Sequence, residues 1–109
     1  IKHQVRPVNT PRVWATIVTD GAGNVSVLDG AGVAGVAISG TAIVVKFADA
    51  FLDNKYAVLV SGYDGSVATG TPKFSVYQPN NTTTTAEIAC VTDPATENLI
   101  LYLLVLGRQ

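Results

Sequence analysis

Acidic side chains are the groups in this sequence best suited to chemistry, because a pair of carboxylates can cleave a glycosidic bond. The sequence has eight Asp and Glu residues, and nearly all of them fall in segments rich in Gly, Asn and Pro, which are typical of turns. Only Glu87 stands in the middle of an apolar run. A domain this small is not expected to form a deep cleft with two converging acids, so we predict that the protein is not an enzyme.

The other reactive side chains lack partners. His3 is the only histidine and Cys90 the only cysteine, whereas a zinc site needs three or four ligands. Asp20 and Asn24 resemble calcium ligands, but the later acidic ligand of a calcium loop is missing, and an Asp-Gly turn explains both. Cys90 alternates with Ile88, which predicts a small buried side chain. We therefore expect no catalytic residue, no metal and no cofactor.

Composition excludes further classes. Only 14% of the 109 residues are charged and 48% are hydrophobic, with a net charge of −1; an average soluble domain has about 25% charged residues. No basic run is present, which argues against nucleic-acid binding. The longest apolar run, Leu99 to Leu106, is far shorter than the roughly 20 residues of a membrane helix. We expect one domain that neither binds nucleic acid nor inserts into a membrane.

Short β-rich runs alternate with Gly, Asp, Asn and Pro, and no stretch carries a sustained helical pattern. The runs predict an all-β chain, an antiparallel, jelly-roll-like β-sandwich of about eight strands. Asp29–Gly32 and Ser39-Gly40 are expected to be turns. Residues 1–11 are expected to be an arm or linker, and 12–109 the sandwich. The predicted strands are Arg12–Val18, Asn24–Leu28, Val33–Ile38, Thr41–Phe47, Tyr56–Ser61, Lys73–Gln78, Thr83–Thr92 and Asn98–Gly107.

The last run is apolar on both faces, because successive side chains of a strand point to opposite sides. One face is expected to pack on the facing sheet, and no helix is available for the other. We predict that a second copy of the chain covers it, since obligate interfaces resemble a core cut in half; the alternative is a loop or the arm. Trp14 is expected to be a core or interface anchor. The interface candidates are Ile100, Tyr102, Leu104, Leu101, Leu103 and Trp14.

The order of several short motifs resembles the C-terminal tip domains of bacteriophage tail fibres and tailspikes. Those domains pair an early R-x-W strand with a G-T-x-x-x-V-x-F hairpin and a D-x-x-Y-x-V strand. The matching residues here are Arg12 to Trp14, Gly40 to Phe47 and Asp53 to Val58. The ordered likeness covers Arg12 to about Val60, and Ala42 stands where such domains often carry an aromatic residue.

The resemblance implies a β-sandwich that forms a homotrimer around a fibre axis. It implies a place at the distal end of a phage tail in the virion, after an upstream shaft, where the domain binds a host-surface glycan or outer-membrane component. Two alternatives stay open. The domain could be a trimerisation or capping unit without a receptor role, or a monomeric carbohydrate-binding module with a covered last strand.

Strand counting predicts which loops would touch a receptor. If every strand runs antiparallel to its predecessor, and the arm marks the shaft side, the turns after the first, third, fifth and seventh strands are distal. The longest distal loop, Gly62–Thr71, combines a tyrosine with short polar residues, as antibody paratopes do. The candidate receptor-binding residues are Tyr63, Asp64, Ser66 and Thr69, supported by Asp20, Asp93 and Glu97.

Overall fold

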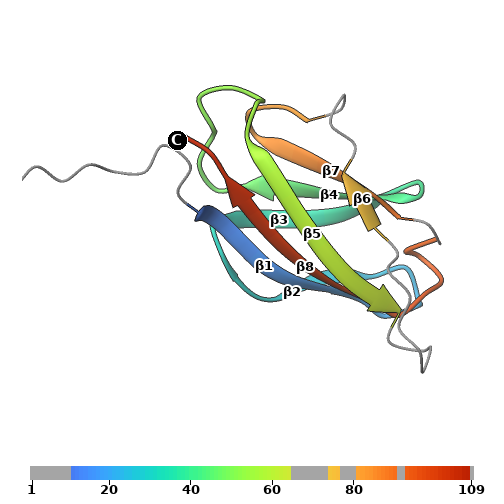
Figure 1. The fold of residues 1–109 in the computed structure, drawn as a ribbon. Helices are drawn as coiled ribbons and strands as arrows, with labels where there is room; N and C mark the ends of the chain where they lie inside the picture. Colours follow the sequence, from blue (N-terminus) through green and yellow to red (C-terminus); the bar gives the residue numbers. More distant parts are fainter. Residues whose placement is uncertain (1–10, 65–73, 77–80, 91–92, 109) are drawn as a thin grey trace, which may run out of the picture.

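The computed structural model describes residues 11–64, 74–76, 81–90 and 93–108, and side chains within 13–63, 81–90 and 93–108. His3, Ser66 and Thr69 lie outside these ranges. The described ranges contain strands and turns and no helix, so the all-β prediction is confirmed (Figure 1). No helix long and apolar enough to cross a membrane is found in them.

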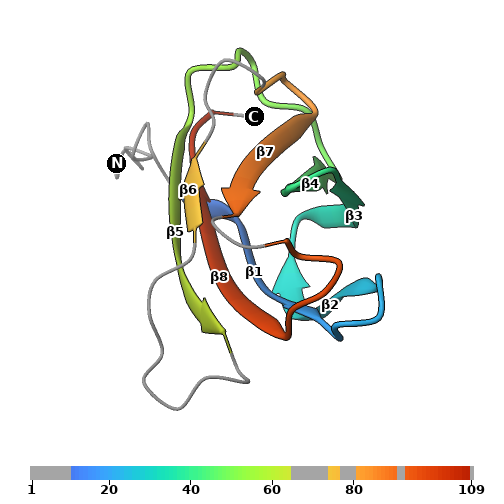
Figure 2. The same cartoon turned by 90° about the vertical axis from the view of Figure 1, so that its right-hand side faces the viewer.

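The strands form two antiparallel sheets (Figures 1 and 2). The first sheet has the order β2-β1-β8-β5 and the second the order β3-β4-β7-β6. The strands are β1 (Pro11–Thr19), β2 (Val25–Ala31), β3 (Val33–Ser39), β4 (Ala42–Phe47), β5 (Ala57–Asp64), β6 (Phe74–Val76), β7 (Thr85–Cys90) and β8 (Leu99–Leu106).

The two sheets face each other across one hydrophobic core, as in a β-sandwich. Along β8 the burial alternates strictly: Leu99, Leu101, Leu103 and Val105 are at most 4% exposed, and the residues between them are not buried. The same alternation places residues of three more strands in the core. Beside β8 in the first sheet, β1 contributes Val13, Ala15 and Ile17. From the facing sheet come Ile43, Val45 and Phe47 of β4 and Ala86, Ile88 and Cys90 of β7. Cys90 is thus a buried apolar residue, as predicted.

The strand order differs from the jelly-roll-like arrangement that we expected. Consecutive strands pair as hairpins within one sheet at β1–β2, β3–β4 and β6–β7. A jelly roll, built from two Greek keys, sends consecutive strands mostly to opposite sheets. The predicted hairpin between the third and fourth strands is present, but its two-residue loop is Gly40-Thr41 rather than Ser39-Gly40, because Ser39 pairs with Ala42. Gly40 has a φ of 60° at the position that a type II′ turn gives to glycine.

The predicted turn at Asp29–Gly32 is wrong, because β2 continues to Ala31 and only Gly32, with a φ of 80°, separates it from β3 in the other sheet. Gly30 serves close packing rather than a turn. A Cβ added to it would lie 2.6 Å from the carbonyl oxygen of Trp14 and 2.9 Å from the Cβ of Ala15. The pairing of β1 with β2 shifts register between Thr16 and Ile17, which is the mark of a β-bulge.

The register defines two ends of the sandwich. At one end Pro11 of β1 pairs with Leu106 of β8, which also pairs with Ala57 of β5. At the other end Ile100 of β8 pairs with both Val18 and Tyr63. We call these the entry end and the far end. The turn after β1, the β3–β4 hairpin and the segment before β8 all lie at the far end (Figure 1), as strand counting predicts.

Candidate interaction surfaces

On the side that points away from the core, the strands β1, β8 and β5 of the first sheet carry apolar and uncharged side chains. We call this surface the outer face. It has no Asp, Glu, Lys or Arg among its described members, and Trp14, Leu59 and Tyr102 are 44%, 53% and 46% exposed. The edge strand β2 borders it with the exposed Asp29, which pairs with Thr16. Its residues are Trp14, Thr16 and Val18 of β1, Ile100, Tyr102, Leu104 and Leu106 of β8, and Ala57, Leu59, Ser61 and Tyr63 of β5.

These side chains form rows across the three strands. Leu104 pairs with Trp14 on one side and Leu59 on the other. The next row is Thr16, Tyr102 and Ser61, and the row nearest the far end is Val18, Ile100 and Tyr63. Because directly opposed side chains lie about 5 Å apart, each row is a continuous contact line across the face.

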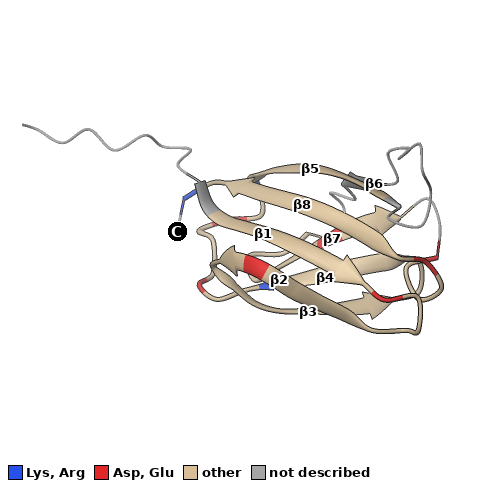
Figure 3. Cartoon of the chain, turned by 90° about the horizontal axis from the view of Figure 1, so that it is seen from below, with Lys and Arg blue, Asp and Glu red and all other residues tan. Residues whose placement is uncertain are grey.

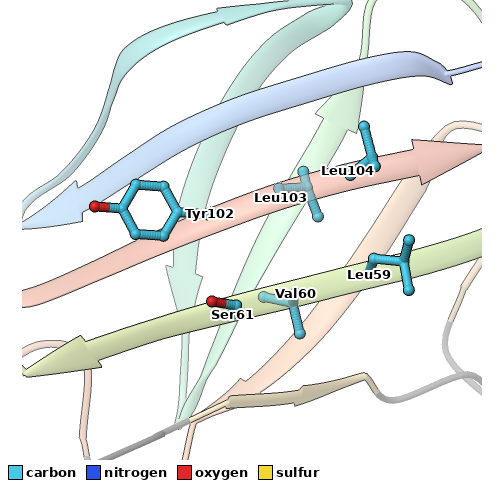
Figure 4. A pocket seen from close by; sticks show the side chains of 6 residues that line it. All are labelled: Leu59, Val60, Ser61, Tyr102, Leu103 and Leu104. Atoms are coloured by element: carbon cyan, nitrogen blue, oxygen red, sulfur yellow. The ribbon is translucent and has the colours of Figure 1, made fainter. Parts of the chain in front are cut away.

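A shallow groove of about 280 Å³ runs between β5 and β8 on the outer face (Figure 4). Its walls come from two adjacent rows, with Leu59 and Leu104 in one and Ser61 and Tyr102 in the other. Val60 and Leu103 line its floor, since they belong to the residues that alternate toward the core. The groove is apolar, with polar atoms from Ser61 and Tyr102.

Tyr63 belongs to the outer face rather than to a loop. The predicted fifth strand ends at Ser61, whereas β5 continues to Asp64 and pairs with β8 along its whole length. A hydrogen bond with Tyr63 raises the pKa of the Tyr102 hydroxyl. The two tyrosines therefore connect the row of Thr16, Tyr102 and Ser61 to the row nearest the far end.

The structure divides the interface candidates into two groups. Trp14, Ile100, Tyr102 and Leu104 lie on the outer face, where a second chain can reach them. The prediction is wrong for Leu101 and Leu103, which are 0% and 4% exposed within a single chain. Both faces of the last strand are apolar in sequence, and the facing sheet takes up the side that carries these two leucines.

The far end carries two turns built around aspartates. The Oδ1 atom of Asp20 accepts hydrogen bonds from the backbone N–H groups of Ala22 (2.8 Å) and Asn24 (3.1 Å), and its Oδ2 accepts one from the Asn24 side-chain amide (2.7 Å). These bonds, led by that of the Asn24 side chain, lower the pKa of Asp20. In the second turn Asp93 Oδ1 accepts a hydrogen bond from the N–H of Ala95 at 2.9 Å.

The two turns are joined to each other. The Thr19 hydroxyl donates a hydrogen bond to the carbonyl of Glu97 and accepts one from the N–H of Leu99. A Cβ added to Gly21 would come within 3.2 Å of Oδ1 of Asn98, so the first turn lies against the second. Sequence reasoning missed Thr19; a single threonine at a strand end gives no sign that it is 6% exposed and bonded to a distant segment.

The structure brings some of the candidate receptor residues together. Asp20 and Asp93 are exposed and Glu97 is half-buried in the two adjacent turns. Asp64 ends β5 at the same end, with its side chain outside the described residues. Figure 3 shows acidic positions at both ends of the sandwich, including the turns at the far end. Lys55 and Arg108 flank the paired ends of β5 and β8 and so lie at the entry end, where Arg108 is 3.9 Å from Asp53.

Sequence reasoning also missed Leu59 and Ser61 on the outer face. The alternation of the segment from Tyr56 to Ser61 puts them on one side, but which side faces solvent depends on the pairing with β8. Among the described residues, no group of three or more His, Cys, Asp or Glu lies close enough to hold a metal ion. Comparison of the chain with protein-family models, with curated proteins and with solved structures finds no match.

Proposed function

We propose that this domain assembles with copies of itself through the outer face and binds a host-cell surface receptor, a glycan or an outer-membrane component, with its far end. The single observation that carries the proposal is the uncharged, aromatic-rich outer face. Its described residues are only half-buried or exposed, although they include Trp14, Tyr102 and Leu59.

The composition of the outer face favours a second copy as its occupant. Three strands about 4.8 Å apart, with eight residues rising about 3.3 Å each, give a footprint of roughly 350–400 Å². Contiguous apolar patches of this size on single chains are often interaction sites. Transient partners use more polar surfaces, whereas permanent interfaces between identical chains are more apolar and are depleted of charge.

A ring of copies around an axis along the strands would point every far end in the same direction. The number three comes from the resemblance to the tip domains of phage tail fibres and tailspikes, which also implies the place in the virion. In such an assembly the Asp20 and Asp93 turns of all copies would gather at one end. Their carboxylates are acceptors for the hydroxyl groups of a glycan, and the hydrogen bonds within each turn keep them preorganised.

The first test is the mass of the purified chain in solution, measured by light scattering. We expect three times the mass of one chain for the wild type and for Leu52→Lys, and one chain mass for Leu104→Lys. Leu52 is a matched control because it is 65% exposed but lies in the segment between β4 and β5. A wild-type protein that stays monomeric overturns the assembly and favours a single-chain carbohydrate-binding module.

The second test is binding to whole host cells. We expect the double variant Asp20→Ala, Asp93→Ala to keep the wild-type mass and to lose most of its binding, whereas Lys55→Ala, at the entry end, keeps it. An assembled double variant that binds as strongly as the wild type contradicts the receptor role of these turns. The domain would then be a trimerisation or capping unit.

A further inference from the structure

We propose that the indole ring of Trp14 from one copy fills the groove between β5 and β8 of the next copy. This inference rests on the proposed self-association and names the contact that carries it. Trp14 and the groove lie on the same outer face, on opposite sides of β8. Each copy therefore offers both a projecting aromatic side chain and a hollow to receive one.

Trp14 does not fill the groove of its own chain. Its strand is two strand positions away from β5, which corresponds to about 9–10 Å. Trp14 is 44% exposed, and the groove residues Leu59 and Tyr102 are 53% and 46% exposed. Both the side chain and the hollow are thus unfilled by the described part of the chain.

The level of Trp14 along the strands matches the level of the groove. Trp14 shares a row with Leu104 and Leu59, which form one end of the groove, and the neighbouring row supplies Tyr102 and Ser61. In a ring with its axis along the strands, the side of one copy formed by β2 and β1 meets the β5 side of the next at the same level.

The chemistry of the groove suits an indole. Leu59 and Leu104 offer apolar contact to the ring, and the Ser61 hydroxyl is an acceptor for the indole N–H. Its volume of about 280 Å³ lies below the roughly 300–1,000 Å³ of small-molecule pockets. Tryptophan is also one of the residue types enriched among the side chains that dominate binding energy at interfaces.

Cysteine cross-linking tests the contact in the full chain. In a Cys90→Ala background, Thr16→Cys with Ser61→Cys keeps Trp14 and places one cysteine on each side of the proposed contact. The same two positions within one chain are about 9–10 Å apart, too far for a disulfide. We expect mild oxidation to give covalently linked chains up to the size of the ring. The control pair is Thr16→Cys with Ala57→Cys. Ala57 lies at the entry end of the outer face, away from the level of Thr16, so this pair is expected to form few cross-links.

Tryptophan fluorescence supplies an independent readout, because Trp14 is the only tryptophan. We expect the assembled protein to emit at shorter wavelength and to resist acrylamide quenching. Ser61→Arg, which fills the groove, is expected to shift the emission to longer wavelength and restore quenching, whereas Leu52→Lys leaves both unchanged. An assembled wild type with a freely quenched Trp14 and no Thr16–Ser61 cross-link overturns this inference but leaves the proposed self-association standing. A monomeric wild type overturns both.

Discussion

The hydroxyl oxygen of Thr19 accepts a hydrogen bond from the backbone N–H of Leu99 at 2.8 Å. The same hydroxyl donates to the carbonyl of Glu97. One side chain at the end of β1 therefore satisfies two backbone groups 78 and 80 positions away in the chain. This contact fixes the two aspartate turns relative to each other.

Thr19→Val removes both hydrogen bonds and keeps the shape of the side chain. We expect a loss of about 1–3 kcal/mol in the free energy of unfolding, because the N–H of Leu99 is left buried without a partner. Chemical denaturation measures this loss. Thr19→Ser keeps the hydroxyl and is expected to lose less than half as much; equal losses for the two variants would mean that the hydrogen bonds contribute nothing.

Gly30→Ala tests the close approach of β2 to β1. The added methyl group would meet the carbonyl oxygen of Trp14 at 2.6 Å, so β2 must move, and we expect a cost of about 1–3 kcal/mol. Gly35→Ala is the matched control, because nothing lies within 4 Å of its added methyl group. Thermal unfolding of the two variants should differ clearly, and an unchanged melting temperature for Gly30→Ala would contradict the structural role of this glycine.

Leu101 and Leu104 separate the core from the outer face. Leu101→Ala empties a core position and is expected to cost about 2–5 kcal/mol of stability, with little direct effect on assembly. Leu104→Ala is expected to keep the stability of the single chain and to weaken assembly. Chemical denaturation measures the stability of both variants, and light scattering measures their assembly. If Leu101→Ala weakened assembly and Leu104→Ala did not, the proposed interface on the outer face would be contradicted.

Tyr56 predicts an alkaline limit to stability. Its hydroxyl is hydrogen-bonded to the carbonyl oxygens of Thr82 and Thr85 at 2.7 and 2.8 Å, and burial raises its pKa to about 12. Because the pKa in the folded state is raised, the stabilisation is complete below about pH 10 and is lost as the pH rises toward 12. Thermal unfolding from pH 8 to 11.5 should show this decline.

Tyr56→Phe provides the comparison for that experiment. We expect it to be less stable than the wild type by about 1 kcal/mol at pH 8 and to show a weaker decline at alkaline pH. Ring contacts with Phe47 and Phe51, whose centroids lie 5.4 and 4.6 Å away, are retained in this variant. A decline identical to that of the wild type would assign the effect to other groups.

Asp20 predicts an acid-sensitive turn. Its pKa is lowered, with the side-chain hydrogen bond of Asn24 as the largest cause. The carboxylate therefore stabilises the turn above its ordinary pKa of 3.8, and this support is lost as the pH falls through the lower value in the folded protein. NMR titration should show Asp20 ionising below 3.8, with the amide signals of Ala22 and Asn24 following it. In Asn24→Ala the midpoint should move upward.

The parts of the fold that depend on local pattern were predictable from the sequence. The alternation of β8 and the glycine hairpin at Gly40 are set by neighbouring residues. The end of β2 was not, because Asp29 and Gly30 have the composition of a turn while Gly30 is required by its contact with Ala15. The extension of β5 through Tyr63 was missed for a similar reason, since it depends on pairing with β8, more than 30 residues later in the chain.

The candidate interaction surfaces were likewise predictable only where they depend on local sequence pattern. Sequence pattern pointed to the apolar residues of β8 and to the turns of Asp20 and Asp93. It left open which side of β8 faces the second sheet, and so it included Leu101 and Leu103 among the interface candidates. The groove could not be foreseen, because it joins β5 and β8 in a register that only the folded sheet defines.

Pro11 and Leu106 pair across adjacent strands, so the described chain enters and leaves the sandwich side by side. A polypeptide with neighbouring ends can be inserted into an exposed loop of an unrelated carrier without pulling that loop apart. The entry end would sit on the carrier, and the two aspartate turns would stand at the opposite extremity. The domain is in this respect suited to insertion into a carrier protein, because its far end would then be the part most distant from the carrier.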